Sequence, residues 1–288
     1  MNMTSTPLRY PGGKGRLTDF IRLIFEQNDL LDGHYIEPYA GGAGVAINLL
    51  LLQYASCIHL NDLNLPVFSF WHSVINAPDE LCKMIVDTPV NMDVWRQQQQ
   101  VQKQAKDHSV LELGFSTFFL NRTNRSGILT GGVIGGNNQE GTWKIDARYN
   151  KSALCKRIEK IALYRSRIRL YNLDAASLIT DVICTLPQKS LVYLDPPYYV
   201  KASRLYQNHY ANDDHVAIAK LVRKKICIPW VVSYDTAPEI MEMYQGFQTI
   251  SYEMNHTAAK NHKGGEVMFF SNNLIVPGVK NPSQMMAA

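Results

Sequence analysis

The chain has 288 residues, of which 46% are hydrophobic and 19% are charged, and its formal net charge is +4. These values fit one large α/β domain with an insertion better than two equal domains. The sequence contains no apolar run of membrane-spanning length and no signal-peptide pattern at its start, so we expect a cytoplasmic protein. The five cysteines are dispersed and include no CxxC pair, which predicts reduced thiols in a packed interior and no metal site.

The first part of the chain alternates predicted strands and helices. Residues 10–14 lack the spacing of a phosphate-binding loop and predict a flexible loop that presents Lys14. The next elements are a strand at 35–39, a glycine turn at 40–44, a helix at 45–52, a strand at 57–60 and a helix through 67–71. Further strands are predicted at 168–171, 191–194, 228–233 and 267–270. This order predicts an α/β fold that begins with a βαβ unit.

Residues 75–165 differ in composition from the rest of the chain. They hold a glutamine-rich helix around residues 97–104, an apolar segment ending at residue 120 and a loop rich in glycine and asparagine from 127 to 141. We interpret this stretch as an inserted lobe. Basic residues crowd its end and the residues that follow: Lys151, Lys156, Arg157, Lys160, Arg165, Arg167 and Arg169. They form either a solvated helix face or a phosphate-contacting surface, and the sequence leaves both open.

The glycine turn at residues 40–44 is the first chemical signal. Between a strand and a helix, Gly41 and Gly42 let the backbone pass close to a ligand, and the helix N-terminus favours a negative group. Asp62 follows about 20 residues on, the spacing of a carboxylate that binds ribose hydroxyls. Glu37 lies near the end of the preceding strand, just before Pro38, where we expect it to face the same crevice. The pattern favours a nucleotide-like cofactor, and the alternative is a tight turn with a surface aspartate.

The second signal is the tetrapeptide Asp195-Pro196-Pro197-Tyr198, directly after an apolar run at 190–194. Ligands of open α/β sheets bind outside the carboxyl ends of the strands, and two successive prolines fix the backbone there. The pattern predicts an active site. The alternative is an ordinary strand-ending turn.

Taken in order, these motifs identify a family resemblance. The chain resembles the Dam-type DNA adenine-N6 methyltransferases, the alpha class, in which cofactor motifs come first and the DPPY motif follows an inserted target-recognition domain. The matching segments are residues 8–14, 36–42, 61–64, 118–123, 195–198, 232–235 and 264–266. The resemblance implies a Rossmann-like methyltransferase fold with a mainly parallel sheet flanked by helices. It places the catalytic domain at 1–74 and 166–288, and a mostly helical target-recognition domain with a hairpin at 75–165.

The same resemblance implies S-adenosylmethionine as the cofactor and no metal. The expected cofactor-binding residues are Tyr10, Lys14, Glu37, Tyr39, Gly41, Gly42, Asp62 and Asp174. Tyr10 and Lys14 would line the methionine end of the cofactor, and Glu37 with the glycine turn would hold its amino and carboxylate groups. Asp62 would take the ribose hydroxyls, and Asp174 would contact the adenine.

The expected catalytic residues are Asp195, Pro196, Pro197 and Tyr198. The exocyclic amine of adenine is a poor nucleophile because its lone pair is delocalised into the ring. The Asp195 carboxylate and the Pro196 carbonyl would each accept one N–H of this amine, while Tyr198 stacks on the base. The base must leave the duplex to reach such a pocket, so we expect base flipping and direct in-line transfer.

DNA contacts are expected within a hairpin at residues 121–130. The candidates are Arg122, Asn124, Arg125, Ser126 and Thr130. Here the chain departs from its GATC-modifying relatives, which carry an aromatic residue and an asparagine before the glycine and an arginine after it, so recognition of GATC is in doubt. Arg122 is assigned to phosphate, and Arg125 is left open between guanine and phosphate.

Two other kinds of function stay open. One is methylation of cytosine N4 or of RNA adenine, although the intact Asp195 favours adenine. The other is a non-catalytic, DNA-binding role within a restriction or defence assembly. The expected partner is double-stranded DNA, a restriction or defence partner is left open, and we expect a monomer or a weak dimer.

Overall fold

The computed structural model describes residues 5–9, 13–199, 210–256 and 262–285. The chain divides into two compact units. The helical unit comprises Met1–Gly13 and Asn64–Leu170, and the sheet unit comprises Lys14–Leu63 and Tyr171–Ala288. The helical unit begins earlier than the predicted domain at 75–165, because α3 (Leu65–Asn76) packs on α6 (Val110–Thr123) through the stacked rings of Phe70 and Phe118. Which of its residues recognise DNA stays a prediction.

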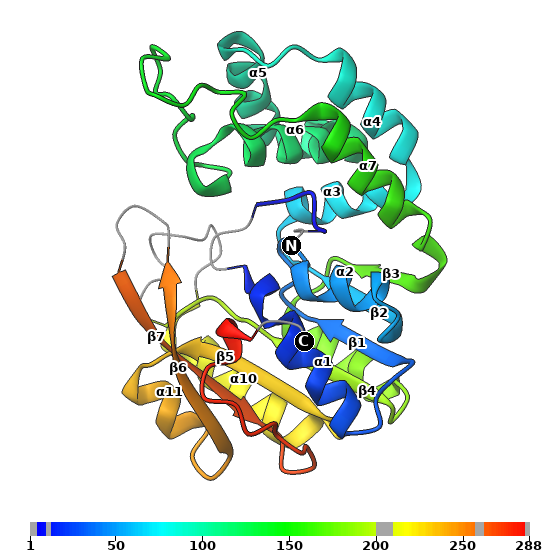
Figure 1. Cartoon of the computed structure of the whole chain (residues 1–288), viewed down its shortest axis with the longest axis vertical. Coiled ribbons are helices and arrows are strands. Elements are labelled where there is room, and N and C mark those ends of the chain that lie inside the picture. Colours follow the sequence, from blue (N-terminus) through cyan, green and yellow to red (C-terminus); the bar gives the residue numbers. More distant parts are fainter. Residues whose placement is uncertain (1–4, 10–12, 200–209, 257–261, 286–288) are drawn as a thin grey trace. The chain divides into compact units, whose positions relative to one another are not determined.

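Among the described residues, seven strands, most of them in the sheet unit, form one sheet in the order β3-β2-β1-β4-β5-β7-β6 (Figure 1). Their bounds are β1 Gly33–Glu37, β2 Ala55–Asn61, β3 Ile168–Tyr171, β4 Ser190–Leu194, β5 Trp230–Asp235, β6 Gln248–His256 and β7 His262–Phe270. Strand β1 pairs in parallel with β2 and β4, and β4 pairs in parallel with β5. Strand β7 runs antiparallel to both β5 and β6. This mostly parallel sheet confirms the predicted Rossmann-like fold class.

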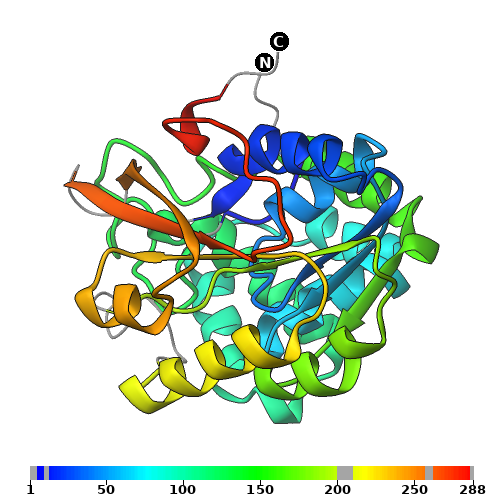
Figure 2. The same cartoon turned by 90° about the horizontal axis from the view of Figure 1, so that it is seen from below.

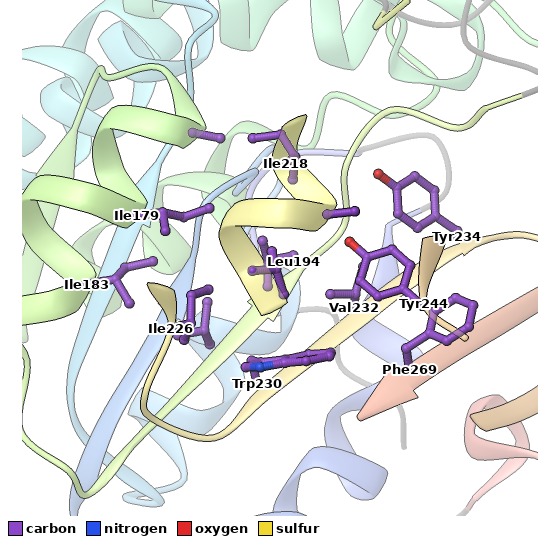
Figure 3. Packing of buried hydrophobic residues seen from close by; sticks show 14 of the residues in the cluster. Ile179, Ile183, Leu194, Ile218, Ile226, Trp230, Val232, Tyr234, Tyr244 and Phe269 are labelled. Atoms are coloured by element: carbon purple, nitrogen blue, oxygen red, sulfur yellow. The ribbon is translucent and has the colours of Figure 1, made fainter. Parts of the chain in front are cut away.

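Helices cover both faces of this sheet. The helices of the unit are α1 Thr18–Gln27, α2 Gly44–Leu51, α8 Ala175–Ser177, α10 Asn212–Lys225 and α11 Pro238–Met243. Figure 2 shows α1 on one face and α10 on the other. On the α10 face, Leu194 and Val232 of the sheet pack with Ile179 and Ile218, all of them buried (Figure 3). Full burial of such a side chain contributes about 1.5–3 kcal/mol.

The helical unit confirms the mostly helical lobe that the sequence predicts. Its helices are α3, α4 Pro78–Asp87, α5 Met92–Lys103, α6 and α7 Lys151–Ala162. Helix α6 starts with a capping box, in which Ser109 accepts from the backbone N–H of Glu112 and the Glu112 carboxylate accepts from that of Ser109. Helix α5 is the predicted glutamine-rich helix.

Several elements differ from the sequence-based prediction. Strand β5 begins at Trp230 rather than at residue 228, since Pro229 has no N–H to donate to the sheet. Strand β6 and helices α1, α10 and α11 were not predicted. Cys57, Cys82 and Cys155 are buried, as predicted for thiols in a packed interior, whereas Cys184 and Cys227 are exposed. In the part of the chain that the structure describes, no helix combines the length and the hydropathy needed to cross a membrane.

Candidate active site

Four strands of the sheet unit end in carboxylates at one edge of the sheet. Glu37 is the last residue of β1, Asp62 follows β2, Asp195 follows β4, and Asp235 is the last residue of β5. These strands are parallel, so their carboxyl ends lie at the same edge. The strand order changes direction between β1 and β4, because β2 lies on one side of β1 and β5 on the far side of β4. Ligands of open α/β sheets bind at such a switch point.

Asp195 is held from β5 and from the N-terminal segment of the sheet unit. The hydroxyl of Ser233 donates to its Oδ1 at 2.8 Å, and the hydroxyl of Tyr193 lies 2.8 Å from that of Ser233. The Lys14 ammonium lies 3.5 Å from the same oxygen. Burial raises the pKa of Asp195, while Lys14 and Ser233 oppose the rise. The result is a carboxylate that is fixed in place and more basic than usual.

Tyr198 is anchored through its hydroxyl. This hydroxyl donates to Glu266 Oε1 at 2.9 Å, and Lys14 Nζ lies 3.1 Å from it and 2.9 Å from Glu266 Oε2. All three residues are at most 6% exposed. Burial alone would lower the pKa of Lys14, but Asp195, Tyr198 and Glu266 outweigh it and raise that pKa well above its usual value. Lys14 therefore stays charged, and it lies beside the predicted catalytic turn.

The backbone of that turn is pinned at its far end as well. The N–H of Tyr199 donates to Asp235 Oδ1 at 2.8 Å, and Asp235 is 5% exposed. Strand β5 thus holds the turn twice, through Ser233 at its start and Asp235 at its end. The ring of Tyr199 is half-buried and lies 5.2 Å from that of His215.

Glu37 is a buried carboxyl group at the switch point. It is 5% exposed, and its Oε1 accepts the backbone N–H of Ala46 in α2 at 3.2 Å. Burial raises its pKa to about 8, Ala46 opposes the rise, and the charge of Asp195 adds to it. At neutral pH the side chain therefore carries a proton, unless a cation binds beside it.

Asp62 shapes the glycine turn. Its Oδ2 accepts the N–H of Gly41 at 2.9 Å, and Gly41 has a φ of +46° that favours glycine.

Asn61, which is 1% exposed, joins three segments of the chain by hydrogen bonds. Its Nδ2 donates to the carbonyls of Pro38 at 2.9 Å and Leu173 at 3.0 Å, and its Oδ1 accepts the N–H of Leu173 at 2.9 Å.

The other predicted cofactor residues have different surroundings. Asp174 is exposed and caps α8 by accepting the N–H of Ala176 at 2.8 Å. The hydroxyl of Tyr39 lies 3.0 Å from that of Tyr210. Gly42 is buried in the turn before α2. Tyr10 lies outside the described residues.

Among the predicted DNA residues, the helical unit buries Arg122 and Asn124. Arg122 is 7% exposed and donates to the carbonyl of Pro7, and burial lowers its pKa to about 9. Asn124 accepts from Trp95 Nε1 at 2.7 Å and donates to the carbonyls of Ile128 and Leu129, both at 2.9 Å. Both side chains hold the unit together in this conformation, and their DNA contacts stay predictions.

Arg125, Ser126 and Thr130 lie in the loop that Asn124 shapes. Arg125 and Thr130 are exposed, and Ser126 is half-buried with a φ of +56°. The predicted hairpin bounds of 121–130 were wrong at the N-terminal side, since α6 runs on to Thr123. A single antiparallel bridge instead joins Asn124 to Val133, and the N–H of Arg125 donates to the carbonyl of Gly132 at 2.9 Å.

Sequence reasoning missed several residues that position the site. Ser233, Asp235 and Glu266 lie in segments that carry the family resemblance, yet they were given no role. The signal for the first two was their i, i+2 spacing on a strand, which puts both side chains on one face.

In the helical unit, the side chain of Trp143 is 66% exposed, and the Arg148 guanidinium lies 5.9 Å from its ring centroid.

Comparison with known proteins gives a family match. A family model described as D12 class N6 adenine-specific DNA methyltransferase matches residues 10–257. No curated protein matches the sequence. Two structures of the rRNA methyltransferase aviRa from Streptomyces viridochromogenes are similar at 11% and 12% identity, with TM-scores of 0.38 and 0.39, and cover 92% of this chain and 87% and 88% of that chain. Protein LPL1258 from Legionella pneumophila is similar at 11% identity and a TM-score of 0.33, over 91% of this chain and 86% of that one. Likeness at this level identifies no substrate.

The contacts of Asn61 predict a large loss of stability on truncation. Replacing Asn61 by Ala removes three hydrogen bonds and strands the backbone groups of Pro38 and Leu173, so unfolding should require about 2–4 kcal/mol less free energy. Urea unfolding measures this difference. The control is Asn76→Ala, which removes one bond from an exposed side chain and should change stability by less than about 0.5 kcal/mol. Equal effects of the two variants would contradict the role of Asn61.

Proposed function

Because the chain belongs to the D12 class N6 adenine-specific DNA methyltransferases, we propose that the strand-end crevice of its sheet unit moves a methyl group directly from S-adenosylmethionine to the N6 amine of a flipped-out adenine. The observation that carries this proposal is Asp195, a half-buried carboxylate held by Ser233 and Lys14 at the start of a doubly pinned turn. Family membership favours DNA adenine over cytosine N4, RNA adenine and a non-catalytic role. A restriction or defence partner and the oligomeric state stay predictions.

The residues at the switch point fit the proposed cofactor. Among the described residues, no lysine, arginine or histidine forms an ion pair with Glu37, although its carboxyl group is 5% exposed. An ammonium group such as that of the methionine moiety would stabilise the charged form of this carboxyl. Asp62 and the glycine turn that it holds lie at the ends of the neighbouring strands β2 and β1. We propose that they bind the remaining parts of S-adenosylmethionine. When bound, S-adenosylmethionine supplies a methyl group on a positively charged sulfur.

The chemistry of the transfer depends on how the turn holds the adenine amine. Ser233 and Lys14 both approach Oδ1 of Asp195, so we assign Oδ2 to one N–H of the amine and the Pro196 carbonyl to the other. Two acceptors in fixed positions concentrate the nitrogen lone pair on the side that faces the methyl group. The raised pKa of Asp195 makes its carboxylate a stronger acceptor. Tyr198, anchored by its hydroxyl, is proposed to stack on the base.

Replacing Asp195 by Ala is predicted to abolish turnover but not DNA binding. It removes an acceptor that acts on the reacting amine, so methyl transfer from labelled S-adenosylmethionine should fall roughly 1,000-fold or more, while DNA affinity changes less than about threefold. The matched control is Asp181→Ala, an exposed aspartate of the same unit, which should keep wild-type turnover. If Asp195→Ala lost DNA binding and turnover to the same extent, the assignment would fail.

The raised pKa of Glu37 predicts proton release when the cofactor binds. At about pH 6.5 the Glu37 carboxyl carries a proton in the free protein, because its pKa is about 8. An amino group with a pKa near 8 is charged at that pH, and its binding beside Glu37 expels the carboxyl proton. Calorimetric titrations in buffers of different ionisation enthalpy should therefore show release of up to about one proton.

Two variants test this assignment. Glu37→Gln has no proton to release, so its binding enthalpy should no longer depend on the buffer. Glu26→Gln, which alters an exposed glutamate of the same unit, should behave as the wild type. Undiminished proton release by Glu37→Gln would rule out Glu37 as the group that faces the amine.

The helical unit is proposed to read DNA through its exposed loop residues. Arg125 and Thr130 are exposed, whereas Arg122 and Asn124 bond to carbonyl groups of their own unit. A buried guanidinium must break its bond to Pro7 before it contacts a phosphate, so Arg125 is the better candidate for a contact with guanine or phosphate. Trp143 is proposed as an additional contact, since an exposed indole provides a stacking surface for a base.

Replacing Arg125 by Ala is predicted to weaken DNA binding in one of two distinguishable ways. Loss of a bidentate guanine contact should cost about 5–150-fold in affinity for the preferred site and relax its sequence at one position. Loss of a phosphate contact should weaken binding to all sequences and reduce the salt slope by about 0.9. Titrations of labelled duplexes at several salt concentrations separate the two. Arg96→Ala, an exposed arginine paired with Asp93 in the same unit, is the control, and an identical effect of both variants would argue against a specific role for Arg125.

A further inference from the structure

Two histidines and a cysteine converge on one face of strands β1 and β2. His34 of β1 lies opposite Cys57 of β2 in the parallel register, and Ile36 lies opposite His59. Cys57 and His59 are two residues apart and therefore share a face of the strand. One ring nitrogen of each histidine and the Cys57 sulfur lie within 4.8 Å of one another. Because the three side chains come from two strands, no CxxC-type spacing marks them in the sequence.

The distances between these atoms approach those of a tetrahedral metal centre. His34 Nδ1 lies 3.0 Å from His59 Nε2, and Cys57 Sγ lies 3.8 Å from His59 Nε2. Zinc bonds of about 2.05 Å to nitrogen and 2.3 Å to sulfur, at tetrahedral angles, separate two nitrogens by about 3.3 Å and a nitrogen from a sulfur by about 3.6 Å. The remaining edge, between His34 and Cys57, is no longer than 4.8 Å.

A neighbouring hydroxyl group orients one ligand. Nδ1 of His59 lies 3.0 Å from the hydroxyl of Tyr171, and the two rings are stacked with 4° between their planes. Donation from Nδ1 to this hydroxyl leaves Nε2, the nitrogen that faces His34 and Cys57, with a lone pair. Metal-bound histidines usually make such a second hydrogen bond, which fixes the tautomer and the ring orientation.

We infer that His34, Cys57 and His59 form a binding site for a divalent metal ion of zinc-like preference, with solvent as the fourth ligand. Imidazole nitrogen and thiolate sulfur are the donors that Zn²⁺ and Co²⁺ prefer. On binding, two metal–nitrogen bonds and one metal–sulfur bond form as the hydrated ion loses all but one of its bonds to water, the Cys57 thiol proton passes to solvent, and the proton of His34 moves to its other ring nitrogen. His34 is half-buried, so solvent reaches the site on its side.

The site would act as a clamp between β1 and β2 rather than in catalysis. Glu37, the last residue of β1, and Asp62, which follows β2, lie at the carboxyl ends of the two strands, three residues beyond His34 and His59 respectively. An ion that joins the two strands fixes the register on which the spacing of these carboxylates depends. Binding to the folded state alone also stabilises the protein.

Metal titration of the full-length protein, stripped with a chelator, tests the inference. The wild type should bind one Zn²⁺ per chain in competition with a chromogenic chelator. Co²⁺ should give the absorption of a tetrahedral ion with a thiolate-to-metal charge-transfer band. Cys57→Ser should weaken Zn²⁺ binding at least tenfold and remove the charge-transfer band, and His34→Gln should weaken binding at least tenfold while keeping a hydrogen-bonding side chain beside His59.

Cys184→Ser, which alters an exposed cysteine of the same unit, is the control and should bind Zn²⁺ as the wild type does. Circular dichroism and the melting temperature establish that the variants are folded, and a rise in melting temperature with Zn²⁺ should occur in the wild type and Cys184→Ser only. Absence of binding by the wild type would overturn the proposal, leaving a hydrogen-bonded histidine pair. Wild-type affinity in folded Cys57→Ser and His34→Gln, or loss of binding in Cys184→Ser, would overturn it as well.

Discussion

The Lys14 ammonium group, buried among Glu266, Asp195 and the Tyr198 hydroxyl, joins three distant segments of the sheet unit. Removing such charges from water costs several kcal/mol per ion, and only close partners offset this cost. Glu266 provides both of its oxygens, one to Lys14 and one to Tyr198. Loss of one partner would leave a buried charge without compensation, at a cost of about 3–5 kcal/mol. The segment that begins at Lys14, the turn at residues 195–198 and strand β7 are therefore stable in this arrangement only together.

The second constraint acts on the backbone of the turn. Ser233 and Asp235 are two residues apart on β5 and share one face of the strand. Ser233 holds Asp195 before the Pro196-Pro197 pair, and Asp235 holds the N–H of Tyr199 after it. Proline fixes φ, so little backbone freedom remains between the two anchors. In the proposed mechanism, the two acceptors for the adenine amine would therefore be in place before the base arrives. Electrostatic catalysis depends on this kind of preorganisation, because groups that are already oriented need no rearrangement during the reaction.

The sequence identified residues with local signals and missed those that act over long separations. Glu37, Asp62 and Asp195 were found because each ends or follows an apolar run, and the strand order brings two of those runs together at the switch point. Asn61 bonds to residues 23 and 112 positions away, and Glu266 bonds to Lys14 across 252 positions. Hydrophobic periodicity along the sequence does not indicate hydrogen-bond partners that are this far apart. Strands β6 and β7 show the same limit, since the apolar run of β7 was predicted from the sequence and its neighbour β6 was not.

Two residues with similar surroundings in the sequence can also differ in burial in the structure. Arg122 and Arg125 are three positions apart in a basic, polar stretch, yet the end of α6 lies between them, and only Arg125 is exposed. Asn124 makes the difference, because it uses both ends of its amide to join Trp95 to the loop carbonyls. Gly127 supports the same loop, since its φ of +77° and its contact with the Arg9 carbonyl exclude a side chain. The loop is therefore shaped by buried contacts, and on the proposed function its exposed positions would carry the sequence preference for DNA.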